Sequence, residues 1–195
     1  MRPGLRAEPS ASFRPPDSPQ QLIRLRGAQR LGLHRRLRGL LMRFLFIDRV
    51  TSLERGHRIT GIKSFAASEP FLESHFTRAA LVPGVLLIEA MAQLLGWLAS
   101  YSYDFRCVAV LALISDVTVP PALKPGARVE IDGRLLTTTE RDSLGAATAT
   151  IDGQVIARVN RLILHHVPLP AGQTAREFFL YYAGVDDLAS LERTA

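Results

Sequence analysis

The middle of the chain reads PGVLLIEAMAQLLGWLASYSY from Pro83 to Tyr103. Good helix formers follow the proline, so this stretch predicts one long helix from Gly84 to about Tyr103. Nearly every side chain in it is apolar, and a helix without a polar face must be buried in protein or in lipid. Glu89 and Gln93 near its middle count against lipid, because a central carboxylate costs about 2.5–3.5 kcal/mol on membrane-insertion scales. We therefore predict a helix buried in protein, and no membrane span.

Strand-like segments flank this helix on both sides. They are rich in β-branched and aromatic residues, which favour strands. The pair Asp152-Gly153 between the last two segments is typical of a two-residue hairpin turn. Two strands, one helix and a further run of strands predict an α+β fold, in which an antiparallel sheet wraps around the central helix. The segments cover residues 44–50, 57–65, 107–119, 128–139, 146–151 and 155–164.

Residues 1–41 differ from the rest of the chain in charge. They hold nine arginines against two acidic residues, whereas residues 42–195 hold fifteen basic and sixteen acidic residues. The basic excess therefore lies outside the part predicted to fold, which disfavours nucleic-acid binding. Residues 1–41 are predicted to be disordered or to precede the true start at Met42, and we favour the second interpretation. An organelle transit peptide and a segment that binds membrane surfaces are the alternatives.

The remaining chain is predicted to hold one domain and an appendage. The domain covers residues 42–167, and residues 168–195 form a linker and a C-terminal helical extension. Cys107 is the only cysteine in the chain, so no internal disulfide can form. A chain without disulfides suits a reducing compartment, and we predict a cytoplasmic location.

The extension is predicted to be a helix from Ala175 to about Arg193 that is interrupted at Gly184. It contains a cluster of aromatic residues at positions 178–182. Such a cluster is expected to cover apolar surface of the domain or of a partner subunit. A role in ligand binding is the less favoured interpretation.

Two titratable residues flank the start of the central helix. His75 can act as a base, because the ordinary pKa of histidine is about 6.5. Glu89 is expected to be buried, and an apolar environment favours the protonated form of a carboxyl group. Gln93 follows four residues later on the same face and could hydrogen-bond to Glu89. The unpaired N–H groups at Gly84 and Val85 could stabilise negative charge on a carbonyl oxygen.

These groups suffice to take a proton from one carbon atom and release a hydroxyl from the next. Each also has a structural interpretation. A lone histidine in a loop is often solvated, and a lone glutamate in an apolar helix is often paired with a residue distant in sequence. On the residues alone, the sequence indicates an α+β domain with a buried carboxylate.

Four sequence blocks narrow these alternatives. They are FLFIDRV at residues 44–50, EPF at 69–71, HF at 75–76 and PGVLLIEAMAQ at 83–93. In composition and spacing they resemble the hot-dog-fold (3R)-hydroxyacyl-[acyl-carrier-protein] dehydratases of the FabZ type. The resemblance covers residues 44–96 and extends more weakly to about residue 164.

The resemblance implies a hot-dog fold and a site that dehydrates (3R)-3-hydroxyacyl thioesters to trans-2-enoyl thioesters, in fatty-acid or polyketide-type biosynthesis. His75 would be the base and Glu89 the acid. Gly84 would hold the thioester carbonyl, and Val85, Gln93 and Phe76 would also bind substrate.

The partners of the site are also implied by the resemblance. The substrate would be bound to acyl carrier protein, and no metal or redox cofactor would be needed. Base and acid of one site would come from different subunits, which implies a homodimer or higher homo-oligomer.

The sequence departs from the family beside the predicted base. Thr77 stands where proline usually follows the pair His-Phe, and Ala79-Ala80 replaces a further histidine–proline pair. Two alternatives to the dehydratase remain, and these departures bear on the second. One is a hot-dog thioesterase, in which the helix carboxylate would activate water. The other is a non-catalytic subunit or acyl-binding partner of a separate, active dehydratase.

Overall fold

The computed structural model of the chain describes residues 45–74, 79–169 and 172–192. All of these residues belong to one of the two structural units of the chain, Phe44–Ala195. The predictions for residues 1–41 fall outside the described residues. So do those for His75 and Phe76.

Six antiparallel strands form a single sheet in the order β1-β2-β4-β5-β6-β3. The predicted hairpin turn is confirmed, because Asp152 and Gly153 both have positive φ angles, of 49° and 77°, as a type I′ turn requires. The bounds are β1 Arg49–Glu54, β2 Arg58–Ser64, β3 Cys107–Thr118, β4 Arg128–Thr138, β5 Asp142–Ile151 and β6 Gln154–Pro168.

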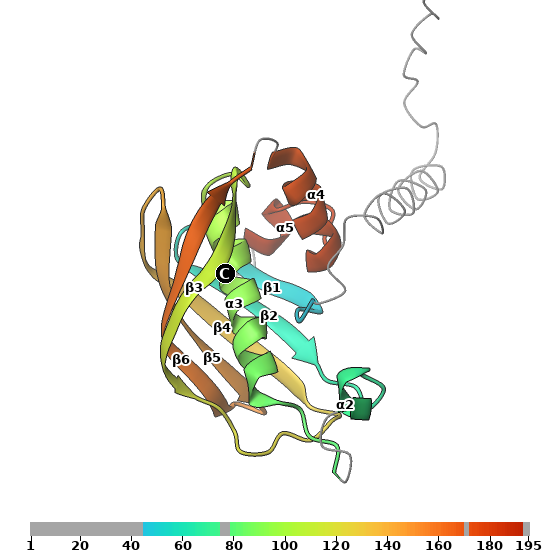
Figure 1. Cartoon of the computed structure of the whole chain (residues 1–195). Coiled ribbons are helices and arrows are strands. Elements are labelled where there is room, and N and C mark those ends of the chain that lie inside the picture. Colours follow the sequence, from blue (N-terminus) through green and yellow to red (C-terminus); the bar gives the residue numbers. More distant parts are fainter. Residues whose placement is uncertain (1–44, 75–78, 170–171, 193–195) are drawn as a thin grey trace, which may run out of the picture. The chain divides into compact units, whose positions relative to one another are not determined.

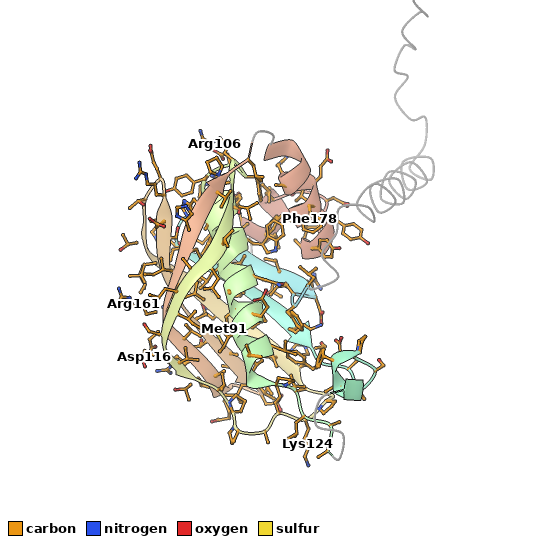
Figure 2. All side chains as sticks on the ribbon, viewed as in Figure 1. Met91, Arg106, Asp116, Lys124, Arg161 and Phe178 are labelled. Atoms are coloured by element: carbon orange, nitrogen blue, oxygen red, sulfur yellow. The ribbon has the colours of Figure 1, made fainter. Side chains whose placement is uncertain are left out.

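The central helix α3, Gly84–Ser102, lies across one face of the sheet (Figure 1). Its length and mean hydropathy of 1.3 would suit a membrane span, but 61% of an 18-residue stretch of the helix is buried inside the fold. Leu87, Met91, Leu94 and Leu98 have no exposed surface and point into the core, and Figure 2 labels Met91 at its centre. The helix is therefore buried against protein, as its sequence predicts.

Three strand predictions were wrong in their bounds, and one of them is the last strand, which continues to Pro168 and does not end at residue 164. The first strand begins at Arg49 and not at residue 44, because the N–H of Phe46 donates to the side chain of Gln93 instead of joining the sheet. Strand β5 begins at Asp142, although the residues there suggest a polar turn. Those residues can lie in a strand because their polar side chains have partners, such as Ser143 with Thr138 at 2.7 Å.

A short helix, α2, was not predicted. It covers Phe71–Ser74, where the sequence suggests an irregular loop. The N–H of Leu72 donates to the carbonyl of Glu69 at 2.9 Å, which continues the turn that begins before Pro70. The four residues of α2 lead directly to His75.

The C-terminal extension forms two helices, α4 at Gly172–Ala183 and α5 at Ala189–Glu192. The predicted interruption at Gly184 is confirmed, since this residue has a φ of 72° and ends α4. Phe179 of α4 is 1% exposed and packs against Trp97 of α3. The prediction that the aromatic cluster covers apolar surface is therefore confirmed for Phe179.

A buried histidine near the end of β6 is hydrogen-bonded to the start of β5. His166 is 4% exposed, and its Nε2 lies 2.8 Å from the Ser143 hydroxyl. Its Nδ1 lies 3.3 Å from the carbonyl oxygen of Glu140, and its ring contacts the edge of Tyr103. Burial lowers the pKa of His166 below the ordinary value of 6.5, against smaller opposing effects of the Glu140 carbonyl and the charge of Asp142.

The buried position of His166 predicts a loss of stability in mild acid. Its pKa is lower in the folded than in the unfolded chain, so the unfolded chain binds the proton first as the pH falls. The stability is present above about pH 6.5, the unfolded value, and is lost as the pH falls through the folded pKa. Thermal unfolding of wild type and His166→Asn over this range should show a weaker pH dependence in the variant. Exposed His57 offers the matched control substitution, His57→Asn.

Candidate active site

One side of α3 keeps contact with solvent while the rest of the helix is buried. Val85, Glu89, Gln93 and Trp97 follow one another at four-residue spacing, which places them in one row along the helix. Glu89 is therefore half-buried and not fully buried as its sequence suggests, because the sheet covers only the opposite side of α3. The residues of α3 that are not buried are Gly84, Val85, Ile88, Glu89, Gln93, Trp97 and Ser102.

The Glu89 carboxylate is held by a side-chain amide. Nε2 of Gln93 donates to Oε1 of Glu89 at 2.7 Å, which is the contact expected from their spacing. Oε1 of Gln93 accepts from the backbone N–H of Phe46 at 2.8 Å. Because an amide has a distinct acceptor and donor end, the bond to Phe46 fixes which end of Gln93 faces Glu89.

The start of α3 lies one turn before Glu89 in the same row. Pro83 has extended backbone angles, and no side chain caps the helix. The first N–H groups of a helix have no partner within it, so those at Gly84 and Val85 are available to an acceptor. Val85 is 62% exposed, so the helix start is open to solvent.

Gly84 is required by packing at this helix start. A Cβ atom there would lie 2.9 Å from two side-chain carbon atoms of Val119, which follows β3. Real Cβ contacts of that length are essentially never seen. The absence of a side chain therefore lets the chain after β3 pack directly against the start of α3.

Lys63 is a residue of this region that sequence reasoning missed. The residue is 6% exposed, and its Nζ lies 3.1 Å from Asp48 and 3.3 Å from Glu69. Asp48 also accepts from the N–H of Ser64 at 2.6 Å. Asp48 belongs to the block FLFIDRV and Glu69 to the block EPF. Two acidic residues without an assigned basic partner were therefore a signal in the sequence that could have pointed to Lys63.

Aromatic contacts join the same segments. The ring of Phe46 lies 6.2 Å from that of Phe71 on α2 and 6.5 Å from that of Phe65. Phe46 thus contacts the chain that leads to His75 with its ring and contacts Gln93 with its N–H. The predicted base His75 and the predicted contact residue Phe76 follow directly, outside the described residues.

The described residues offer acid–base chemistry and no cluster of metal ligands. Within residues 45–74, 79–169 and 172–192, no three His, Cys, Asp or Glu side chains gather as a metal site. His165 and His166 are both engaged, by Asp142 and Ser143. The site therefore consists of an oriented carboxyl group beside the uncapped start of a helix.

Comparison with known proteins shows the family of this chain. A family model described as a FabA-like domain matches residues 41–160. The 3-hydroxyacyl-[acyl-carrier-protein] dehydratase FabZ of Thiobacillus denitrificans is 34% identical over 118 residues, which cover 58% of this chain and 81% of that protein. The FabZ of Bacillus subtilis is 32% identical over 117 residues, with 60% and 83% covered.

Solved structures show the same fold. The dehydratase heterocomplex ApeI:P from Xenorhabdus doucetiae matches with a TM-score of 0.53 and 16% identity, over 69% of this chain and 90% of that one. At this identity the likeness concerns the fold alone.

The family match contains the site and leaves out the extension. Residues 41–160 include Lys63, Glu89 and Gln93, whereas α4 and α5 follow the matched region. The arrangement of six antiparallel strands against one central helix is that of the hot-dog fold, as predicted. The resemblance seen in the four sequence blocks is confirmed, and the chain belongs to the FabA-like family.

Proposed function

We propose that Glu89 and His75 dehydrate (3R)-3-hydroxyacyl thioesters carried by acyl carrier protein to trans-2-enoyl thioesters. The dehydratase activity itself follows from the family and from the FabZ relatives. The observation that supports the role of Glu89 is its hydrogen bond to Gln93, which is itself oriented by the N–H of Phe46.

The proposed reaction breaks two bonds and forms one double bond. His75 takes a proton from C2, and the electron pair of that bond forms the double bond between C2 and C3. The C3–O bond breaks as the Glu89 carboxyl group donates its proton to the departing hydroxyl, which leaves as water. His75 ends protonated and Glu89 ionised, so a proton must return from one to the other, through solvent or product, before the next turnover.

The start of α3 supports the first half of this reaction. Removal of the C2 proton places negative charge on the thioester oxygen. The N–H groups of Gly84 and Val85 and the positive end of the helix dipole favour that charge. Since no side chain caps the helix, a substrate oxygen has no competitor from the N-cap residue.

We further propose that a second copy of this chain completes the site. Strand β3 lies at the edge of the sheet, and its apolar side chains are exposed on both faces. Val110 is 48% exposed, Leu113 45% and Ile114 38%. A free, apolar edge strand offers unpaired backbone groups to another strand. Pairing with β3 of a second copy would cover this surface and give a symmetric dimer.

The proposed function is tested by the ultraviolet absorbance of the enoyl thioester. Purified protein is mixed with 3-hydroxybutyryl and 3-hydroxyoctanoyl thioesters on pantetheine and on acyl carrier protein, and a rise in the enoyl band is expected. Release of free thiol without that band would favour the thioesterase. A folded protein that produces neither signal with any of these substrates would contradict the proposal and favour the non-catalytic subunit.

A further inference from the structure

The C-terminal extension packs against the row of α3 formed by Val85, Glu89, Gln93 and Trp97. It contacts the row at Trp97, the end farthest from the helix start. Trp97 is the last member of this row, and its ring lies 5.5 Å from that of Phe178 and 5.3 Å from that of Phe179. Phe178 is half-buried, and it lies on the helix α4 labelled in Figure 1 and shown with side chains in Figure 2. Trp97 and Phe178 are called the aromatic wall below.

The wall is fixed to the domain by contacts on either side of Phe178. Phe179 is 1% exposed and also packs against Phe105 at 5.5 Å. Ala183 at the end of α4 and Leu191 of α5 are buried in the same core. The hydroxyl of Tyr101, which belongs to α3, donates to the carboxylate of Glu192 in α5. The extension is therefore packed as part of the fold and is not a loose tail.

The order of groups along α3 gives the substrate a direction. In the proposed function the thioester carbonyl, C1, lies at Gly84 and the hydroxyl on C3 lies at Glu89. Carbon atoms from C4 onward therefore continue toward the C-terminal half of the helix, past Gln93. Eight residues separate Glu89 from Trp97, and they correspond to about 12 Å of helix rise.

We infer that the aromatic wall of Trp97 and Phe178 limits the length of the acyl chain that this enzyme accepts. This inference rests on the proposed function. An acyl chain of short or medium length fits along the row between Glu89 and Trp97. A long chain meets two aromatic rings, one on α3 and one on α4, and α4 is anchored by its buried residues Phe179 and Ala183. The substrate class is therefore short- and medium-chain 3-hydroxyacyl thioesters. Trp97 lies within the region that matches the FabA-like family, whereas Phe178 belongs to the extension and lies outside it.

The inference is tested by the chain-length profile of kcat/KM in wild type and in Phe178→Ala. Wild type should favour hydroxybutyryl and hydroxyoctanoyl over hydroxyhexadecanoyl substrates. In the variant, kcat/KM should rise by about tenfold or more for the long substrate, because one methylene group in an apolar pocket already changes kcat/KM by about this factor. The kcat/KM for the short substrate should change little. Glu177→Ala removes an exposed side chain from the same helix and should leave the profile unchanged. Phe178→Leu keeps an apolar side chain at this position and should give a smaller shift in the same direction if Phe178→Ala does not fold.

The fluorescence of Trp97 provides a readout that does not depend on catalysis. It is the only tryptophan in the chain, so its emission reports on the wall alone. Saturated acyl pantetheines lack the hydroxyl and cannot react. Their binding should leave the emission unchanged for butyryl and change it once the acyl chain reaches the wall.

The outcomes separate the inference from the proposed function. The inference is wrong if Phe178→Ala is active but its rate on the long substrate does not rise. It is also wrong if the rates of this variant fall equally for all chain lengths. Emission that stays constant for every acyl chain that binds overturns it as well. If the emission responds to acyl length but no enoyl product forms, the proposed dehydratase function is wrong. The aromatic wall would then stand as part of an acyl-binding site.

Discussion

Glu89→Gln should lower kcat for dehydration by about 10²–10⁴-fold, the usual contribution of a general acid. Glutamine has nearly the same shape as glutamate and keeps a carbonyl oxygen that can accept the 2.7 Å hydrogen bond from Gln93. It has no proton to give to a leaving hydroxyl. The loss should therefore appear in kcat while the melting temperature and KM stay close to wild type, measured by circular dichroism and by the enoyl absorbance.

A neighbouring position provides the control for this variant. Ile88 lies beside Glu89 and is also half-buried, but it has no group that can donate a proton. Ile88→Val should keep most of the rate. If Glu89→Gln remained as active as Ile88→Val, the proton for the hydroxyl would have to come from elsewhere, and the assigned role of Glu89 would be wrong.

The sequence predicted those parts of the fold that depend on local pattern. The central helix was evident because twenty consecutive residues, 84–103, suit a helix and leave it without a polar face. The hairpin at Asp152-Gly153 was evident because few residue pairs accept two positive φ angles. The start of the first strand was predicted wrongly, because the group that removes Phe46 from the sheet is Gln93, distant in sequence.

The candidate site shows the same division. The contact of Glu89 with Gln93 follows from four-residue spacing on a helix, so the sequence was sufficient to predict it. Lys63 lies in a strand fifteen residues from Asp48 and appears in sequence as one lysine among ordinary strand residues. Only the packed fold brings its Nζ between two carboxylates. The packing of Val119 against Gly84 is likewise a contact between distant segments, and no local pattern announces it.

The exposure of Glu89 depends on which sides of α3 other elements cover, and sequence periodicity does not predict this. Apolar residues surround it on the helix, so burial on all sides was the natural prediction. The single sheet covers one side of α3, and α4 covers only the region of Trp97. Among the described residues, the row of α3 from Val85 to Gln93 is only partly covered, and the edge strand β3 exposes apolar side chains. Both observations support the proposed second subunit.

Two kinds of mixed dimer should distinguish a shared site from a site within one chain. His75→Ala and Glu89→Gln are each expected to be inactive alone. When the two variants carry different tags and the mixed dimer is isolated, one of its two sites regains both His75 and Glu89 if base and acid come from different subunits. Because a twofold dimer has two equivalent sites, the mixed dimer should recover about half of the wild-type rate.

The matched control reverses the expected result. A dimer of one wild-type chain and one chain with both substitutions should be inactive if the sites are shared, because each site then lacks one group. It should keep about half of the wild-type rate if each chain holds a complete site. Activity in the second mixed dimer and none in the first would place His75 and Glu89 in the same chain and contradict the proposed completion of the site by a second copy. Activity in the first and none in the second requires that the proton is taken from C2 by one subunit and given to the hydroxyl by the other.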